Sequence, residues 1–140
     1  MDKEYNDKVI LVNNSVDELT RVAGFLEELG EEWNLPVPLV MSLNLVVEEA
    51  LSNIILYGFN DNNEHTIEIL FNRDNSLITI TITDDGIEYD PTQSRDPDIS
   101  LSPSERPVGG LGIFLIKRIM DSVHYKRIDN LNILTLTKNI

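Results

Sequence analysis

The residue types best suited to chemistry in this chain are a carboxylate and an amide four positions apart, Glu49 and Asn53. At about 100° per residue, two positions four apart in a helix share one face. An amide oxygen suits a hard cation such as Mg²⁺, while a neighbouring carboxylate can accept a proton. Glu48 emerges on the opposite flank and cannot easily join the same site. On these residues alone, a solvated glutamate beside a tolerated asparagine remains an open alternative.

A second stretch, 83–91, carries a carboxylate at the end of an alternating strand. Asp84 stands where the strand stops, and Gly86 follows, where the backbone can approach another group closely or adopt a positive φ. A carboxylate held there could accept a hydrogen bond from an exocyclic amine, such as adenine offers. A plain Asp-Gly turn leaving a strand is the alternative.

The third stretch, Val108-Gly-Gly-Leu-Gly-Ile113, is expected to open a helix. Glycines let the backbone come near phosphates, and a helix N-terminus supplies unpaired N–H groups and a partial positive charge. No Gly-Lys-Ser/Thr follows, as a Walker P-loop requires, and a loop rather than a strand precedes the glycines, unlike in the dinucleotide fingerprint.

Hydrophobic periodicity predicts the elements that must position these stretches. Strands are expected at 8–12, 66–71, 77–83, 123–128 and 133–137. Helices are expected from Val16 to near Gly30, from about Pro36 to Gly58, and from Ile113 to about Met120. Four of the six prolines fall in 91–107, which predicts a long loop of the lid type. The order favours an α+β fold with helices on one side of a largely antiparallel sheet.

Composition narrows the class of protein. With 140 residues the chain fits one domain, 1–140. Its formal net charge of -13 argues against binding nucleic acid or an anionic membrane surface. It has no cysteine, so disulfides and thiolate metal sites are excluded. With only two histidines, a histidine-rich metal site is not expected either. We expect no apolar run near the ~18–20 residues that span a bilayer, and the polar N-terminus does not resemble a secretory signal. A cytoplasmic protein is therefore expected.

The three stretches together form a much more specific pattern. Glu-x-x-x-Asn on a helix, Asp-x-Gly-x-x-Tyr-Asp-Pro after a strand, and Gly-Gly-Leu-Gly into a helix resemble the Bergerat-fold ATPases, the GHKL superfamily. Within that group the chain looks most like the anti-sigma factor serine kinases, over nearly its whole length. The resemblance implies an α+β two-layer sandwich with a mixed, mainly antiparallel sheet and helices on one face.

The resemblance also implies roles in a Mg²⁺-dependent ATP site. Glu49 would be the general base, Asn53 the Mg²⁺ ligand, and Asp84 the acceptor for the adenine amino group. The other ATP-binding positions would be Gly86 beside the base and, toward the phosphates, Arg106, Gly109, Gly110, Leu111 and Gly112. Arg21 on the first helix would contact a protein partner. For both arginines an ordinary solvated side chain is the alternative.

Three positions depart from the superfamily pattern. Glu88 stands where many members have a second glycine, and Tyr57 replaces a histidine that is common just after the asparagine. Asn132 stands where others place a threonine near adenine. None of these changes removes a residue that the chemistry requires.

The function implied is that of an ATP- and Mg²⁺-dependent serine-protein kinase with a lid at about 91–108. Its substrate would be a serine on a STAS-type anti-sigma factor antagonist, and the same protein would also bind a sigma factor, as a homodimer. One alternative is an ATP-binding regulator that acts on another STAS partner. Another is a non-catalytic, nucleotide-gated binding module, which the presence of both Glu49 and Asn53 disfavours.

Overall fold

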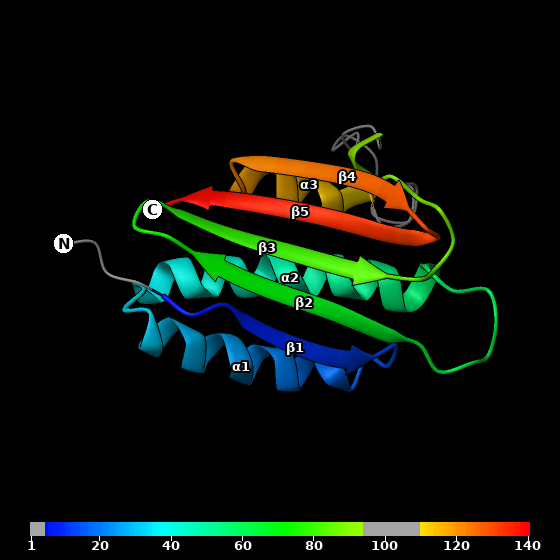
Figure 1. The fold of residues 1–140 in the computed structure, drawn as a ribbon, viewed down its shortest axis with the longest axis horizontal. Helices are drawn as coiled ribbons and strands as arrows, with labels where there is room; N and C mark the ends of the chain where they lie inside the picture. The colour runs from blue at the N-terminus through cyan, green and yellow to red at the C-terminus, as the bar shows by residue number, and fades with distance from the viewer. Residues whose placement is uncertain (1–4, 94–109) are drawn as a thin grey trace.

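The computed structural model describes residues 5–93 and 110–140, which form two layers. A five-stranded sheet lies on one side, and all three helices pack against one of its faces (Figure 1). The strands are β1 (Lys8–Asn13), β2 (Thr66–Arg73), β3 (Leu77–Asp84), β4 (Ser122–Ile128) and β5 (Leu131–Asn139). The helices are α1 (Glu18–Glu32), α2 (Val37–Tyr57) and α3 (Gly110–Ile119), with a short 3₁₀ helix, η1, at Pro91–Gln93. The expected α+β sandwich is confirmed.

The sheet has the strand order β1-β2-β3-β5-β4. Each neighbouring pair is antiparallel, so the described strands contain no parallel pair, although a mixed sheet was expected. The last strand in the chain, β5, lies inside the sheet and pairs with both β3 and β4. Asp129 and Asn130 join β4 to β5 with φ values of 52° and 65°, a conformation that asparagine and aspartate tolerate better than other non-glycine residues.

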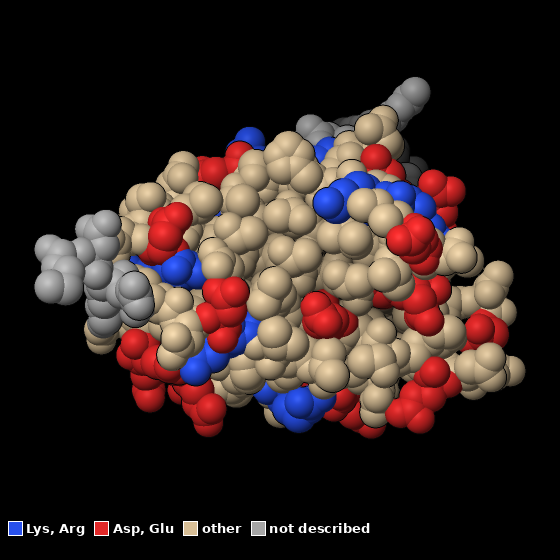
Figure 2. All heavy atoms as spheres, in the orientation of Figure 1, with Lys and Arg blue, Asp and Glu red and all other residues tan. Residues whose placement is uncertain are grey.

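Side-chain alternation along the strands separates the core from the open face of the sheet. In β3, Ile78, Ile80 and Ile82 are at most 1% exposed and face the helices, while the intervening threonines face outward. This is the pattern expected for a strand with one buried face. Figure 2 looks onto the open face, where the side chains over β3 and β5 are mostly uncharged. The helix-covered face therefore holds the core.

The first helix differs from its predicted bounds at both ends. It begins at Glu18 rather than Val16, and it continues to Glu32, slightly past the predicted end near Gly30. Gly30 lies inside the helix, where α2 approaches it so closely that an added Cβ would lie 2.5 Å from Val40 Cγ2. The glycine marks a contact between two helices and not a helix end.

The second helix has the predicted position, with Pro36 at its N-cap and Pro38 in its first turn. In length and composition α2 could span a membrane, with a mean hydropathy of 1.6, so the expectation that no segment reaches that length is wrong. Its buried residues, Leu43, Val46, Val47, Ala50 and Leu51, belong to the core, and Leu39, Ile54 and Ile55 pack against that core. Glu48 and Glu49 also interrupt the apolar run.

Candidate functional site

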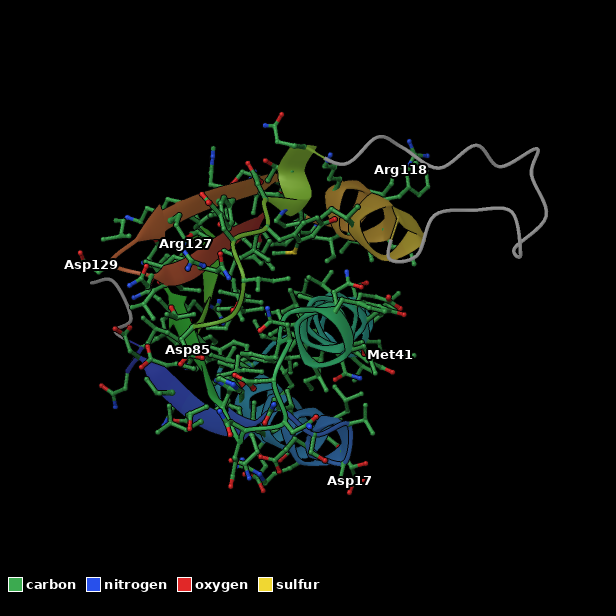
Figure 3. The ribbon with its side chains drawn as sticks, turned by 90° about the vertical axis from the view of Figure 1, so that its right-hand side faces the viewer. Asp17, Met41, Asp85, Arg118, Arg127 and Asp129 are labelled. Carbon is green, nitrogen blue, oxygen red and sulfur yellow. The ribbon has the colours of Figure 1, made fainter. Side chains whose placement is uncertain are left out.

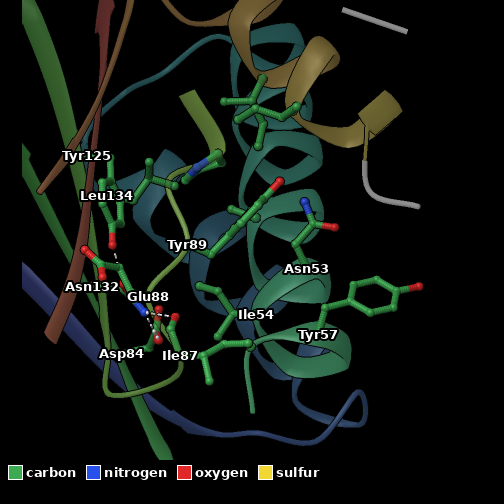
Figure 4. A pocket seen from close by; sticks show the side chains of 15 residues that line it. Asn53, Ile54, Tyr57, Asp84, Ile87, Glu88, Tyr89, Tyr125, Asn132 and Leu134 are labelled. Atoms are coloured by element: carbon green, nitrogen blue, oxygen red, sulfur yellow. Dashed lines mark hydrogen bonds between the residues drawn. The ribbon is translucent and has the colours of Figure 1, made fainter. Parts of the chain in front are cut away.

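A cavity of about 460 Å³ opens between α2, α3 and the adjacent ends of β3, β5 and β4. This volume lies within the roughly 300–1,000 Å³ typical of small-molecule sites. Its lining is mostly apolar, with polar groups at two opposite sides (Figure 4). The lining residues are Ala50, Asn53, Ile54, Tyr57, Gly58, Asp84, Ile87, Glu88, Tyr89, Pro91, Ile113, Ile116, Tyr125, Asn132 and Leu134.

Asp84 is the buried carboxylate of the cavity, only 5% exposed at the end of β3. Its Oδ1 accepts hydrogen bonds from the backbone N–H of Gly86 (2.8 Å) and from Asn132 Nδ2 (3.0 Å). Within the described residues, Oδ2 accepts none. Burial raises the pKa of the Asp84 carboxyl, and the hydrogen bonds from Asn132 and Gly86 oppose that rise.

Gly86 is required by the packing of the turn that follows Asp84. A Cβ at this position would lie 2.3 Å from the Gly58 carbonyl oxygen at the end of α2. The next residue, Ile87, donates its backbone N–H to the same carbonyl at 2.8 Å. The glycine therefore lets the turn dock against α2; the predicted role beside a bound base stays a prediction.

Glu49 and Asn53 lie one turn apart on α2, as the spacing predicted, and Glu48 is exposed. Asn53 lines the cavity across from Asp84 and Asn132 (Figure 4), whereas Glu49 is not among its lining residues. Neither side chain makes a hydrogen bond to another described residue. Both therefore offer a free oxygen beside the cavity, which suits a cation or a hydrogen-bond donor.

The glycine stretch meets Glu49 and Asn53 directly. A Cβ on Gly112 would lie 2.8 Å from Glu49 Oε2 and 3.5 Å from Asn53 Nδ2. The helix α3 begins at Gly110, earlier than the predicted Ile113, so Gly110, Leu111 and Gly112 form its first turn. The first turn of a helix has unpaired backbone N–H groups, which suit phosphate oxygens. Arg106 and Gly109 lie outside the described residues, as does most of the predicted 91–108 lid.

Arg21 is not part of the cavity. Its guanidinium donates to Glu18, at 2.7 Å between Nη2 and Oε2, and to the carbonyl oxygen of Leu11. This pairing, with the backbone N–H of Asn13, lowers the pKa of Glu18 to about 2. Figure 3 shows Asp17, just before α1, at the far margin of the molecule from Arg127. Arg21 is not among the residues that line the cavity, and its predicted partner contact stays a prediction.

Sequence reasoning missed two polar residues that support the site. Tyr125 Oη donates to Asn132 Oδ1 at 2.6 Å, and Arg127 Nη1 donates to the same oxygen at 3.0 Å. Both come from β4, and their inward direction follows from the pairing of Tyr125 with Leu134 and of Arg127 with Asn132. Alternation along β4 could have indicated that they share a face, but not which face.

The donor set fits Mg²⁺ only together with phosphate oxygens. The described residues contain no cluster of three or more histidine or carboxylate ligands. Mg²⁺ is commonly held by one or two protein oxygens and by substrate phosphates, with waters completing its shell. The side-chain oxygen of Asn53, near the first turn of α3, is suited to such a shared shell.

Comparisons with known proteins show the family of the chain. The histidine kinase-like ATPase domain family matches residues 12–138. The chain is 32% identical over 111 residues to the serine/threonine-protein kinase BtrW of Bordetella bronchiseptica, covering 79% of this chain and 77% of that protein. It is 33% identical to the anti-sigma F factor of Oceanobacillus iheyensis, covering 73% and 67%. It is 34% identical to the serine-protein kinase RsbW of the same organism, covering 60% of this chain and 56% of that protein. The chain therefore belongs to the histidine kinase-like ATPase domain family, in the group of anti-sigma factor serine kinases.

Proposed function

We propose that this chain is an ATP-dependent serine-protein kinase that phosphorylates a STAS-type anti-sigma factor antagonist and also acts as an anti-sigma factor. The family match supports ATP use, and relatives named as serine-protein kinases and anti-sigma F factors support both activities. A homodimer and a cytoplasmic location belong to the same proposal. Equilibrium sedimentation of the purified chain tests the dimer.

The observation that carries the proposal is the contact between Gly112 and the pair Glu49 and Asn53. It brings the first turn of α3, a general-base candidate and a cation-ligand candidate to one place beside a cavity of nucleotide size. Separate surfaces for these groups would have left no site for phosphoryl transfer.

In the proposed complex the base would lie in the apolar part of the cavity, with its amino group donating to Asp84 Oδ2. The backbone N–H groups of Gly110 to Gly112 would hold the phosphates, and Asn53 would hold Mg²⁺. When bound, Mg²⁺ would neutralise charge that develops on the phosphates. Glu49 would accept the proton of the attacking serine hydroxyl.

The test is phosphate transfer from labelled ATP, with Mg²⁺, to candidate STAS proteins from the same genome. We expect Glu49→Gln to lower the transfer rate at least roughly 10²-fold, the usual scale for removing a general base. Glu48→Gln is the matched control, because Glu48 is the neighbouring exposed glutamate, and it should leave the rate unchanged.

Calorimetry with ATP accompanies this assay, since Glu49→Gln should still bind the nucleotide. ATP binding without transfer to any candidate would overturn the kinase and favour a nucleotide-gated binding module. Transfer to a STAS protein without any affinity for a sigma factor would favour the regulator that acts on another STAS pathway.

A further inference from the structure

Asn132 is the polar residue most completely paired within the cavity. It lies on β5 directly opposite Asp84 of β3 in the strand register, and it is 7% exposed. Its Nδ2 donates to Asp84 Oδ1 at 3.0 Å and to the Ile87 carbonyl oxygen at 2.9 Å. Figure 4 shows this set of hydrogen bonds at one side of the cavity.

The orientation of the Asn132 amide is fixed by its neighbours on β4. Its Oδ1 accepts from Tyr125 Oη at 2.6 Å and from Arg127 Nη1 at 3.0 Å. Arg127 is itself fixed, because Nη1 also donates to the Gly86 carbonyl oxygen at 2.8 Å. A reversed amide would point its N–H groups at Arg127, which can only donate, and its oxygen at two acceptors, Asp84 Oδ1 and the Ile87 carbonyl, so Nδ2 must face Asp84.

This arrangement determines which group the cavity offers to a ligand. Both N–H groups of Asn132 are used by the protein, and Asp84 Oδ1 already accepts two hydrogen bonds. Asp84 Oδ2 is the oxygen left to pair with a ligand, and it is a hydrogen-bond acceptor. The cavity that Asp84 lines is otherwise mostly apolar, with Ile54, Ile87 and Leu134 among its lining residues.

We propose that Asn132, held by Tyr125 and Arg127, is a positioning residue that orients Asp84 as a hydrogen-bond acceptor. This orientation determines that the cavity prefers a base with an exocyclic amine facing Asp84 over a base with a carbonyl at that position. The inference rests on the proposed ATP site. A carbonyl oxygen facing Asp84 Oδ2 would leave two buried acceptors opposed, which is far costlier than losing a contact at the surface.

Loss of Asn132 changes the chemistry of Asp84 as well as its position. Burial and the neighbouring Asp85 raise the pKa of the Asp84 carboxyl, while Asn132, Gly86 and Arg127 hold it down. The other titratable groups that line the cavity are Glu88 and three tyrosines, Tyr57, Tyr89 and Tyr125. Without Asn132 the carboxyl takes up a proton more readily, and its O–H can then donate to a carbonyl base.

The experiment compares ATP with inosine triphosphate, in which a carbonyl replaces the amine, by calorimetry at pH 6 and pH 8. We expect the wild-type chain to prefer ATP by at least about 100-fold. Asn132→Ala should weaken ATP binding about 10-fold and lower the preference by at least as much, most strongly at pH 6. Asn132→Thr, which restores one donor, should give an intermediate preference.

Asn139→Ala is the matched control, since Asn139 is an exposed asparagine at the other end of the same strand. If Asn132→Ala does not fold by circular dichroism, Tyr125→Phe replaces it and should lower the preference by a smaller factor. An unchanged preference in the folded variants would overturn the inference. Failure of the wild-type chain to bind either nucleotide would instead overturn the proposed function on which the inference rests.

Discussion

At the scale of single residues, His65 links the loop after α2 to the turn that carries Asp84. Its Nε2 lies 2.7 Å from Asp61 Oδ1, and its Nδ1 lies 2.9 Å from Asp85 Oδ1. The ring also stacks on Phe59, with centroids 4.2 Å apart. Two carboxylates favour the doubly protonated imidazolium, so Asp61 first, and then Asp85, raise the pKa of His65 above 6.5.

This contact predicts a pH-dependent contribution to stability. The folded-state pKa lies above the unfolded value, so the stabilisation is complete below about pH 6.5 and is lost as pH rises through the folded pKa. The melting temperature of the wild-type chain should exceed that of His65→Gln at pH 6, and the difference should shrink by pH 9.

Proton NMR measures the His65 titration directly. The chain has two histidines, and the spectrum of His124→Gln identifies which resonance belongs to His65. A titration midpoint at or below 6.5 would contradict the expected effect of the two carboxylates.

At the scale of elements, two glycines of α1 lie in opposite environments. Gly30 is buried against Val40 of α2, with no room for a Cβ. Gly24 is exposed, and an added Cβ would meet nothing within 4 Å. The same substitution in one helix should therefore have opposite effects on the free energy of unfolding.

Gly24→Ala should stabilise the chain by about 0.5–1 kcal/mol, because alanine loses less backbone entropy in a helix. Gly30→Ala should destabilise it by about 1–3 kcal/mol, the usual range for overpacking a core contact. Urea unfolding followed by circular dichroism measures both. Equal effects of the two substitutions would show that α1 does not pack on α2 through Gly30.

The elements themselves were predictable because their hydrophobic periods are long and regular, as in α2 and β3. The ends of these helices and strands were less predictable than their positions. Gly30 resembles a helix stop in sequence, but the packing of α2 makes it an interior residue. The α3 start at Gly110 was missed because glycine is a poor helix former, and tertiary contact with Glu49 and Asn53 accompanies its helical first turn.

The candidate site, like the element ends, could be predicted from the sequence only in part. The positions of Asn53 and Asp84 beside the cavity could be predicted from motif spacing and the family resemblance, and the roles of both residues and of Glu49 stay predictions. Tyr125 and Arg127 could not be predicted, because their function depends on the register between β4 and β5. Register is a property of strand pairing, and no local motif in either strand encodes it.

At the scale of the whole molecule, an excess of negative charge surrounds a small, mostly apolar core. The formal net charge is -13 over 140 residues. Charge of one sign on a compact body repels itself and opposes folding, and salt screens exposed charges over roughly 10 Å at 0.1 M.

Stability should therefore rise with ionic strength. Between about 10 mM and 300 mM NaCl we expect the free energy of unfolding to increase by about 1 kcal/mol, seen as a melting temperature higher by several degrees. Choline chloride should act equally, because screening does not depend on the cation. A melting temperature that falls with salt would indicate that local ion pairs outweigh the general repulsion.

The place of β5 in the sheet has a consequence for how the chain is made. This strand leaves the ribosome after the other four described strands, yet it pairs with β3 on one side and β4 on the other. Until it emerges, both of those strands have an unpaired edge, which is the kind of surface that joins other chains. The cavity also lacks Asn132 and Leu134 until then. A ligand that binds this cavity would therefore stabilise the chain only after β5 has paired, and not before.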